Sequence, residues 1–178
     1  MEKANTLPII GVMGSAEEAH EQLAAPLGKW IADHHCHLLT GGGTGVMESV
    51  SRAFVTVQAR KGRCIGVMPG TFGENGYVTK PGYPNPYVEI PIKTHLPLSG
   101  EMGADLMSRN HVNVLTSDIV VVLPGQEGTL SEAELALRYK KPVAALLPEK
   151  GAFPHLPETI PVYYSLETLT VFIQNHLA

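Results

Sequence analysis

The chain has 178 residues and a mass of 19.1 kDa, which predicts one domain (1–178) large enough to bury a full hydrophobic core. Its net charge of −4 gives no electrostatic reason to expect binding to nucleic acid or to an anionic membrane. No apolar stretch approaches membrane-spanning length, no signal peptide is recognisable, and the two cysteines form no disulfide framework, so we expect a cytoplasmic protein.

Short apolar runs alternate with segments of helical periodicity along most of the chain. Strands are expected at 7–13, 37–40, 64–68, 119–123, 143–147 and 162–164. Helices are expected at 16–33, 46–60, 101–115, 130–139 and 166–176, with Pro26 kinking or breaking the first. Helix-length crossovers between strands predict a Rossmann-like, doubly wound α/β fold, in which helices cover both faces of a mainly parallel sheet.

Residues 71–100 interrupt this alternation with many glycines and prolines, and only 87–92 resemble a strand. A long irregular segment in a compact domain usually covers a site or lies at an interface. Glu74, Lys80 and Tyr83 lie within it, and we expect them to be solvated loop residues unless the segment folds over a ligand.

The stretch 117–148 organises the rest of the sequence. Its two apolar runs flank a loop, Pro124 to Gly128, and a helical segment, which together make one β-loop-α-β unit. In open α/β sheets, phosphorylated ligands bind at such loops, because the unpaired N–H groups at a helix start favour anions. The stretch therefore indicates a site for a small molecule that carries a phosphate group.

Two more glycine-bearing turns follow predicted strands, at 11–15 and 41–45. In a parallel sheet all three turns lie along the same carboxyl edge, so their N–H groups can converge on one ligand. Each turn alone could equally be structural, since glycine commonly serves a turn. Neither GxGxxG nor GxxxxGK[ST] occurs, which argues against a standard NAD enzyme or a P-loop NTPase.

Glu132 has two compatible interpretations. It lies three residues after Thr129, so the pair could form a capping box with Thr129 as the N-cap. Alternatively, the carboxylate faces the ligand from the first helical turn, as a general acid/base or a hydrogen-bond acceptor.

Arg109 lies in a largely apolar helical pattern, with Leu106 and Asn113 expected on its face. A buried arginine needs an anionic partner, and a phosphate group suits its forked donors. The alternative is an ion pair with Asp105 or Asp118.

The histidine-rich stretch His34, His35, Cys36, His37 crosses from a helix end into a strand, so its side chains diverge and no standard zinc spacing is met. We therefore expect no metal site there. No histidine can be placed beside an activated nucleophile, so no catalytic triad is expected either.

PGQEGTLSE, from Pro124 to Glu132, resembles the PGGxGTxxE signature of Lonely Guy-type, lysine-decarboxylase-like proteins. GGGTGVM, from Gly41 to Met47, is similar to that family's second glycine motif, and Arg109 matches its arginine before the central strand. The resemblance implies a Rossmann-like fold and a homodimer or homotetramer. In enzymatic members, the residues matching Glu132 and Arg109 serve hydrolysis of the N-glycosidic bond of nucleoside 5′-monophosphates.

Two departures from the hydrolase pattern stand out. Gln126 replaces the second glycine of PGG, where its side chain would occupy space used by the phosphate, and Asn110 replaces a second cation after Arg109. RNxxNV…SDxVVVLPGxxGTLSE is more similar to the molybdenum cofactor carrier branch, which holds the pterin-phosphate cofactor without transforming it. The favoured function is therefore a carrier of the molybdenum cofactor (molybdopterin), with cofactor-dependent enzymes as candidate partners. The alternative is a nucleoside-monophosphate phosphoribohydrolase that uses Glu132 and Arg109.

The resemblance and the three turns together predict a set of ligand-binding residues. They are Gly14, Ser15, Gly41, Gly42, Gly43, Thr44, Gly45, Met47, Ser108, Arg109, Asn110, Pro124, Gly125, Gln126, Glu127, Gly128, Thr129 and Glu132.

Overall fold

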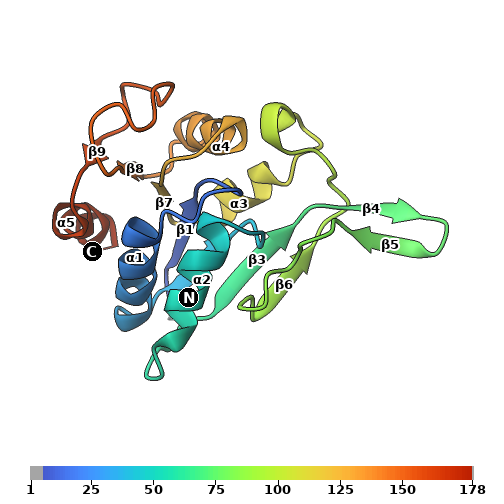
Figure 1. The fold of residues 1–178 in the computed structure, drawn as a ribbon, viewed down its shortest axis with the longest axis horizontal. Coiled ribbons are helices and arrows are strands. Elements are labelled where there is room, and N and C mark those ends of the chain that lie inside the picture. Colours follow the sequence, from blue (N-terminus) through green and yellow to red (C-terminus); the bar gives the residue numbers. More distant parts are fainter. Residues whose placement is uncertain (1–5, 178) are drawn as a thin grey trace, which may run out of the picture.

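The computed structural model describes residues 6–177, and within them a seven-stranded sheet forms the centre of the molecule (Figure 1). Its spatial order is β6-β3-β2-β1-β7-β8-β9, and every neighbouring pair is parallel. The strands are β1 (Ile9–Met13), β2 (His37–Thr40), β3 (Cys64–Met68), β6 (Ile90–Lys93), β7 (Ile119–Val122), β8 (Val143–Leu146) and β9 (Val162–Tyr163).

The order of the strands reverses between β1 and β7, where Gly11 pairs with Val120. From β1 the chain builds outward through β2 and β3 to β6, and it then returns to build β7, β8 and β9 on the other side. This is the doubly wound order, so the predicted fold class is confirmed. Ligands of such sheets bind beyond the carboxyl ends of the strands at this reversal.

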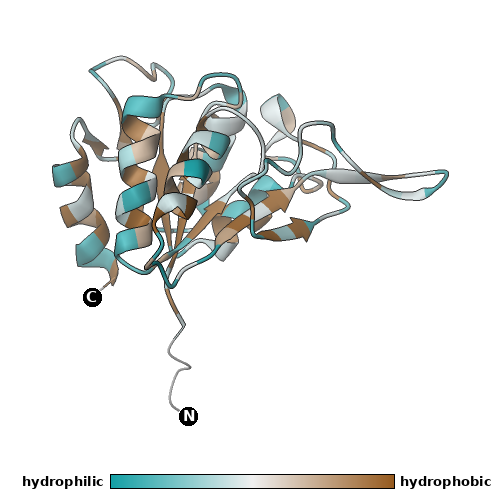
Figure 2. Ribbon diagram, turned by 60° about the horizontal axis from the view of Figure 1, so that its bottom comes forward, coloured by the Kyte–Doolittle hydropathy of each residue, from teal (hydrophilic) through white to brown (hydrophobic). Residues whose placement is uncertain are grey.

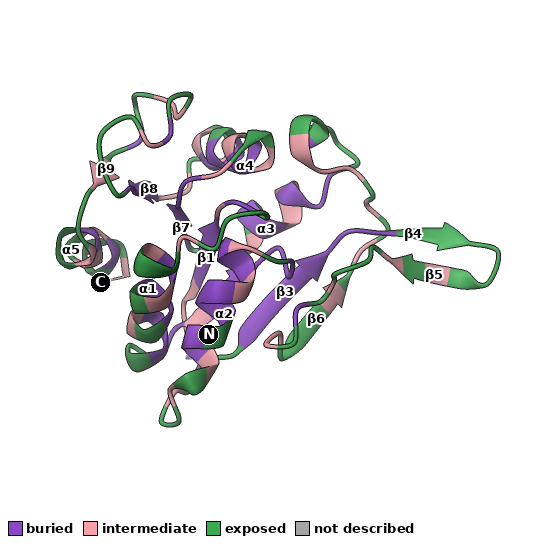
Figure 3. Cartoon of the chain, viewed as in Figure 1, coloured by how far each residue is buried: buried purple, intermediate pink, exposed green. Residues whose placement is uncertain are grey.

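Helices cover both faces of the sheet (Figures 1 and 2). One face carries α1 (Glu21–Asp33), α2 (Val46–Thr56) and α5 (Leu166–Leu177), and the other carries α3 (Asn110–Thr116) and α4 (Glu127–Arg138). Each face has its own cluster of buried apolar side chains. Figure 3 shows the central strands buried throughout, which explains their continuously apolar sequences.

The structure corrects the prediction for 71–100. A β-hairpin of β4 (Gly70–Gly73) and β5 (Gly76–Thr79) extends away from the body (Figures 1 and 3). Only β6 was expected in this region, and it covers 90–93 rather than 87–92. A two-stranded ribbon that packs on no core lacks the alternation of apolar and polar residues by which strands are recognised. Phe72, which is 71% exposed, lies on this ribbon.

The helix expected at 101–115 is wrong in its first half. A 3-10 turn (Gly100–Met102) and further turns precede α3, which begins only at Asn110. Asp105 ends the helical pattern, because its Oδ1 atom accepts a hydrogen bond from the N–H of Met107 at 2.8 Å. Leu106 consequently lies 86% exposed instead of on a helix face with Arg109.

Other boundaries shift by several residues. The first helix begins at 21 rather than 16, and it continues through Pro26 without a break. Pro26 is exposed, as is Gln22, whose carbonyl would otherwise accept the missing hydrogen bond, so water can serve that group. Helix α2 ends at 56 rather than 60. No helix within residues 6–177 is long and apolar enough to cross a bilayer.

The close contact between α1 and α2 depends on Gly28. A Cβ atom at this position would collide with the carbonyl oxygen of Val50 and approach the backbone nitrogen of Phe54 to 3.2 Å. We predict that Gly28→Ala lowers the free energy of unfolding by about 1–3 kcal/mol through overpacking, although alanine is the better helix former. Urea titration measures the change, with Lys29→Ala on the exposed side of α1 as the control. Equal stability of the Gly28 variant and the wild type would contradict this packing.

Candidate functional site

A cavity of about 220 Å³ opens at the carboxyl edge of the sheet, beside the reversal between β1 and β7. All three glycine-bearing turns contribute to its wall, so the expected convergence of these turns is observed. The wall consists of Val12, Met13, Gly14, Ser15, Ala16, Gly41, Met47, Lys80, Tyr83, Ser99, Gly100, Arg109, Asn110, Gln126, Gly128, Thr129 and Glu132.

Ser15 ties the first turn to the third. Its backbone N–H donates to the carbonyl oxygen of Pro124 at 3.0 Å, and its Oγ atom accepts from the N–H groups of Glu17 and Glu18 at 3.1 and 3.0 Å. These bonds fix the loop after β1 against the loop after β7. The two turns therefore present one continuous surface to the cavity.

The second turn contributes mainly support. Gly41 lines the cavity, whereas Gly42, Gly43, Thr44 and Gly45 do not. Thr44 donates from Oγ1 to the carbonyl oxygen of Ala16 at 2.6 Å, which ties this turn to the first one. Gly45 has a φ of 64° and lies so close to the Ser15 carbonyl that no side chain fits. Met47, the second residue of α2, does line the cavity.

Helix α4 begins at the cavity, and the predicted capping box is wrong. Its N-cap is Gln126, so Thr129 lies inside the first turn and donates its N–H to the Gln126 carbonyl at 2.9 Å. The side chain of Thr129 instead packs against Gly125, where a Cβ atom would collide with it. Gly128 and Thr129 bring the first turn of a twelve-residue helix to the cavity wall, where its unpaired N–H groups favour an anion.

Arg109 is the most unusual residue of the cavity. It is 5% exposed, and its guanidinium lies so close to Gly41 that a Cβ there would collide with it. Within residues 6–177, its Nε and Nη1 atoms have no hydrogen-bond partner, and no carboxylate oxygen lies within 4.0 Å. A buried cation without a partner is costly, so the site favours an anionic ligand.

The proposed ion pair of Arg109 with an aspartate does not form. Asp105 accepts the backbone N–H of Met107, and Asp118 accepts that of Ile9 at 2.8 Å through its Oδ2 atom. Both aspartates therefore accept backbone N–H groups instead of pairing with Arg109.

Glu132 faces the cavity from the second turn of α4 and is only 7% exposed. Burial raises the pKa of its carboxyl group, although the charge of Arg109 and a hydrogen bond from Asn113 oppose this shift. The Asn113 amide donates from Nδ2 to Glu132 Oε1 at 2.7 Å. Asn113 lies on α3, so this hydrogen bond joins α3 to α4. The sequence did not reveal this contact.

Asn110 joins α3 to α4 beside the cavity. Its amide donates from Nδ2 to Ser131 Oγ at 2.9 Å and to the Gly128 carbonyl at 3.4 Å. Ser108, a predicted site residue, is buried behind it, does not line the cavity, and accepts the Asn110 N–H at 3.2 Å. Asn110, which replaces the second cation of the hydrolase pattern, therefore helps to fix the start of α4.

Gln126 lines the cavity, as the sequence suggested. Its side chain is exposed and donates from Nε2 to Glu17 Oε2 at 3.1 Å, which bridges the first and third turns. Its predicted neighbours Pro124, Gly125 and Glu127 do not line the cavity.

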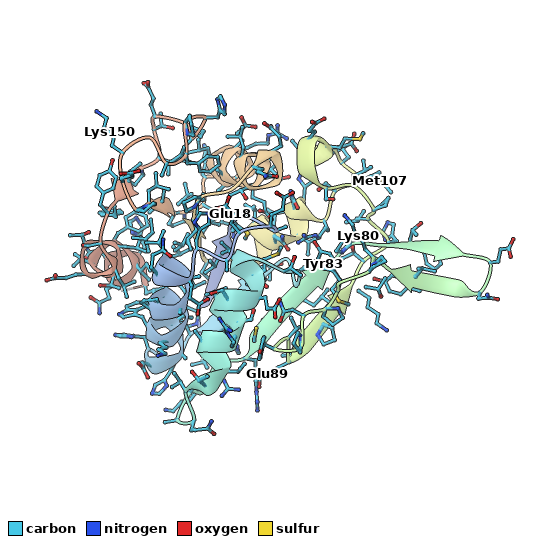
Figure 4. The ribbon with its side chains drawn as sticks, in the orientation of Figure 1. Glu18, Lys80, Tyr83, Glu89, Met107 and Lys150 are labelled. Carbon is cyan, nitrogen blue, oxygen red and sulfur yellow. The ribbon has the colours of Figure 1, made fainter. Side chains whose placement is uncertain are left out.

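Two residues expected to be solvated lie at the cavity. Lys80 and Tyr83 follow the hairpin in sequence and line the cavity wall. Figure 4 shows them close together beside the body of the molecule. The ring centroid of Tyr83 is 5.9 Å from the guanidinium carbon of Arg109. Ser99 and Gly100 complete this side of the wall and were also missed. No periodic pattern marks these loop residues, so only the tertiary structure reveals them.

The histidine-rich stretch lies away from the cavity wall. His34 contacts the Trp30 carbonyl through Nδ1 at 2.8 Å, and His37 Nδ1 accepts the N–H of Arg63 at 2.9 Å. Their side chains have different partners, and within residues 6–177 no three His, Cys, Asp or Glu side chains form a group suited to a metal ion.

The fold and the cavity define a class: a Rossmann-like protein whose candidate ligand site lies at the reversal of strand order and is lined by helix-start donors and a buried arginine.

The chain belongs to the SLOG cluster4 family, whose model matches residues 7–170. It is similar to the molybdenum cofactor binding protein from Rippkaea orientalis, with 30% identity, a TM-score of 0.76, and 98% of this chain and 100% of that chain covered. The molybdenum cofactor carrier protein from Chlamydomonas reinhardtii is 31% identical, with a TM-score of 0.72 and coverage of 97% and 99%. An uncharacterized protein of Archaeoglobus fulgidus is 30% identical over 141 residues, which are 78% of this chain and 80% of that protein. Together these findings confirm the family resemblance that the motifs predicted.

The raised pKa of Glu132 makes stability depend on pH in a defined direction. A raised folded-state pKa stabilises the fold at low pH, and this contribution is lost as the pH rises through the folded-state value. We predict that Glu132→Gln, which removes the charge, is more stable than the wild type at pH 8. The difference should shrink towards pH 4.

Urea titrations at several pH values, in buffers without phosphate, measure this difference. Glu134→Gln is the control, since Glu134 lies exposed on the same helix. A gain that is independent of pH would show that the fold does not raise the pKa of the Glu132 carboxyl.

Proposed function

We propose that the protein binds and carries a phosphorylated pterin, the molybdenum cofactor, without transforming it. The observation that carries this proposal is the guanidinium of Arg109, which is buried beside a cavity with two donor atoms that no described residue satisfies. A phosphate oxygen is a suitable acceptor for such a fork.

The residues around Arg109 fit the phosphate end of this cofactor. The N–H of Gly128 at the start of α4 supplies a further donor, and the loop at Gly14 and Ser15 lines the same cavity. When bound, the cofactor would supply its own molybdenum and dithiolene chemistry. The chain contributes the cradle that binds the anion and excludes part of the solvent.

The relatives support the identity of the ligand. The proteins from Rippkaea orientalis and Chlamydomonas reinhardtii are described as binding or carrying the molybdenum cofactor, and the likeness extends over nearly the full length of both chains. Assembly into a homodimer or homotetramer, a cytoplasmic location and delivery to cofactor-dependent enzymes stay predictions.

The alternative function is hydrolysis of nucleoside 5′-monophosphates. Burial of Glu132 at the cavity wall, with a raised pKa, favours it, because such a carboxyl can act as a general acid. Asn110 weighs against it. The amide stands where the hydrolases usually carry a second cation, and its donors are engaged with Ser131 and Gly128.

We predict that Arg109→Ala lowers the affinity for inorganic phosphate and for neopterin monophosphate by about tenfold to a hundredfold, the range of a charge-assisted hydrogen bond. Isothermal titration calorimetry measures both affinities. Arg138→Ala is the control, since Arg138 is exposed at the far end of α4. Unchanged binding in the Arg109 variant would disprove the anion site.

Incubation with AMP, GMP and IMP tests the alternative function. We predict that chromatography detects no free base with the wild-type protein beyond the level of Glu132→Ala. Release of base by the wild type that is lost in Glu132→Ala would establish hydrolysis and defeat the carrier proposal.

A further inference from the structure

The crossover from β3 to β6 lies over the cavity instead of forming a helix. After the hairpin, residues 80–89 return along the sheet to reach β6, and Val88 packs on Gly66 of β3. Lys80 and Tyr83, near the start of this return segment, form part of the cavity wall. In Figure 4 they lie between the hairpin and the body of the molecule.

Asn85 fastens the return segment to the second glycine turn. Its backbone N–H donates to the carbonyl oxygen of Gly42 at 2.8 Å, and its Nδ2 atom donates to that of Gly43, also at 2.8 Å. Its Oδ1 atom accepts the N–H of Tyr87 at 3.1 Å, and the residue is 4% exposed. One backbone and two side-chain hydrogen bonds of this buried residue fix the chain two residues after Tyr83.

Glu89 fastens the other end of the segment. Its Oε1 atom accepts from Arg60 at 2.9 Å and from Arg63 at 3.1 Å, and its Oε2 atom accepts the N–H of Cys64 at 2.9 Å. The return segment is therefore anchored at both Asn85 and Glu89. It is a preformed wall of the cavity rather than a free loop.

This anchoring gives the ring of Tyr83 a defined place. The ring lies against Gly43, where a Cβ atom would approach it to 2.8 Å, and 5.9 Å from the guanidinium carbon of Arg109. Tyr83 is only half-buried, so part of its ring remains open to the cavity. If a phosphate group binds to Arg109, the part of the ligand that carries this phosphate would lie next to the ring of Tyr83.

We propose that Tyr83 determines specificity by stacking on the planar ring of the ligand, while Arg109 binds the phosphate group, and that Asn85 is its positioning residue. This inference rests on the proposed function and names the residue that recognises the planar ring of the ligand. Aromatic faces bind flat heterocycles through offset stacking. The cavity would then distinguish a phosphate that carries a ring from one that does not.

The test compares neopterin monophosphate with glycerol 3-phosphate, which resembles its phosphate-bearing side chain without the ring. Isothermal titration calorimetry gives the ratio of the two affinities for each variant. We expect the wild type to prefer the ring-bearing ligand, Tyr83→Phe to keep this preference, and Tyr83→Ala to lose about tenfold of it. Asn85→Ala should reduce the same ratio, which a general loss of stability would not change.

Tyr87→Ala is the matched control. It removes a tyrosine side chain from the same segment, but Tyr87 does not line the cavity. No ring preference in the wild type, or an unchanged affinity ratio in Tyr83→Ala, would overturn the proposal. Arg109→Ala should weaken both ligands equally and leave the ratio intact. Unchanged glycerol 3-phosphate binding in that variant would count against the anion site itself, and the Tyr83 ratio tests ring recognition separately.

Discussion

The candidate site depends on one constraint, a buried guanidinium whose donors the described chain leaves unsatisfied. Gly41 has no side chain because Arg109 occupies that space, and the ring of Tyr83 lies beside the same cation. Glu132 is close enough for the charge of Arg109 to act on its pKa, yet too far for an ion pair. An arginine kept in this state is stabilised most simply by a bound anion.

The order of the strands determines where the cavity around Arg109 forms. Because β1 and β7 are neighbours with crossovers leaving in opposite directions, a cavity opens at the carboxyl edge beside the loops that follow them. The anion site is assembled from several distant segments rather than from one phosphate-binding loop. Hydrogen bonds such as Ser15 to Pro124 and Asn110 to Ser131 hold these segments together without using the guanidinium.

The sequence predicted the features that follow from local patterns. Buried strands such as Ile119–Val122 and the three turns were recognisable, because apolar runs and glycines mark them directly. The start of α3 was mistaken, because Asp105 forms a local hydrogen bond that no periodicity reveals. Tyr83 was expected to be solvated unless its segment folded over a ligand, because its place depends on Asn85 contacting Gly42, more than forty residues away. Contacts of this range leave no local signal.

The most direct test of the central claim is a crystal structure of the protein with neopterin monophosphate. The account predicts phosphate oxygens within hydrogen-bond distance of Nε and Nη1 of Arg109, with the first turn of α4 on the other side of the group. A phosphate bound elsewhere, with the guanidinium of Arg109 still without an acceptor, would contradict it.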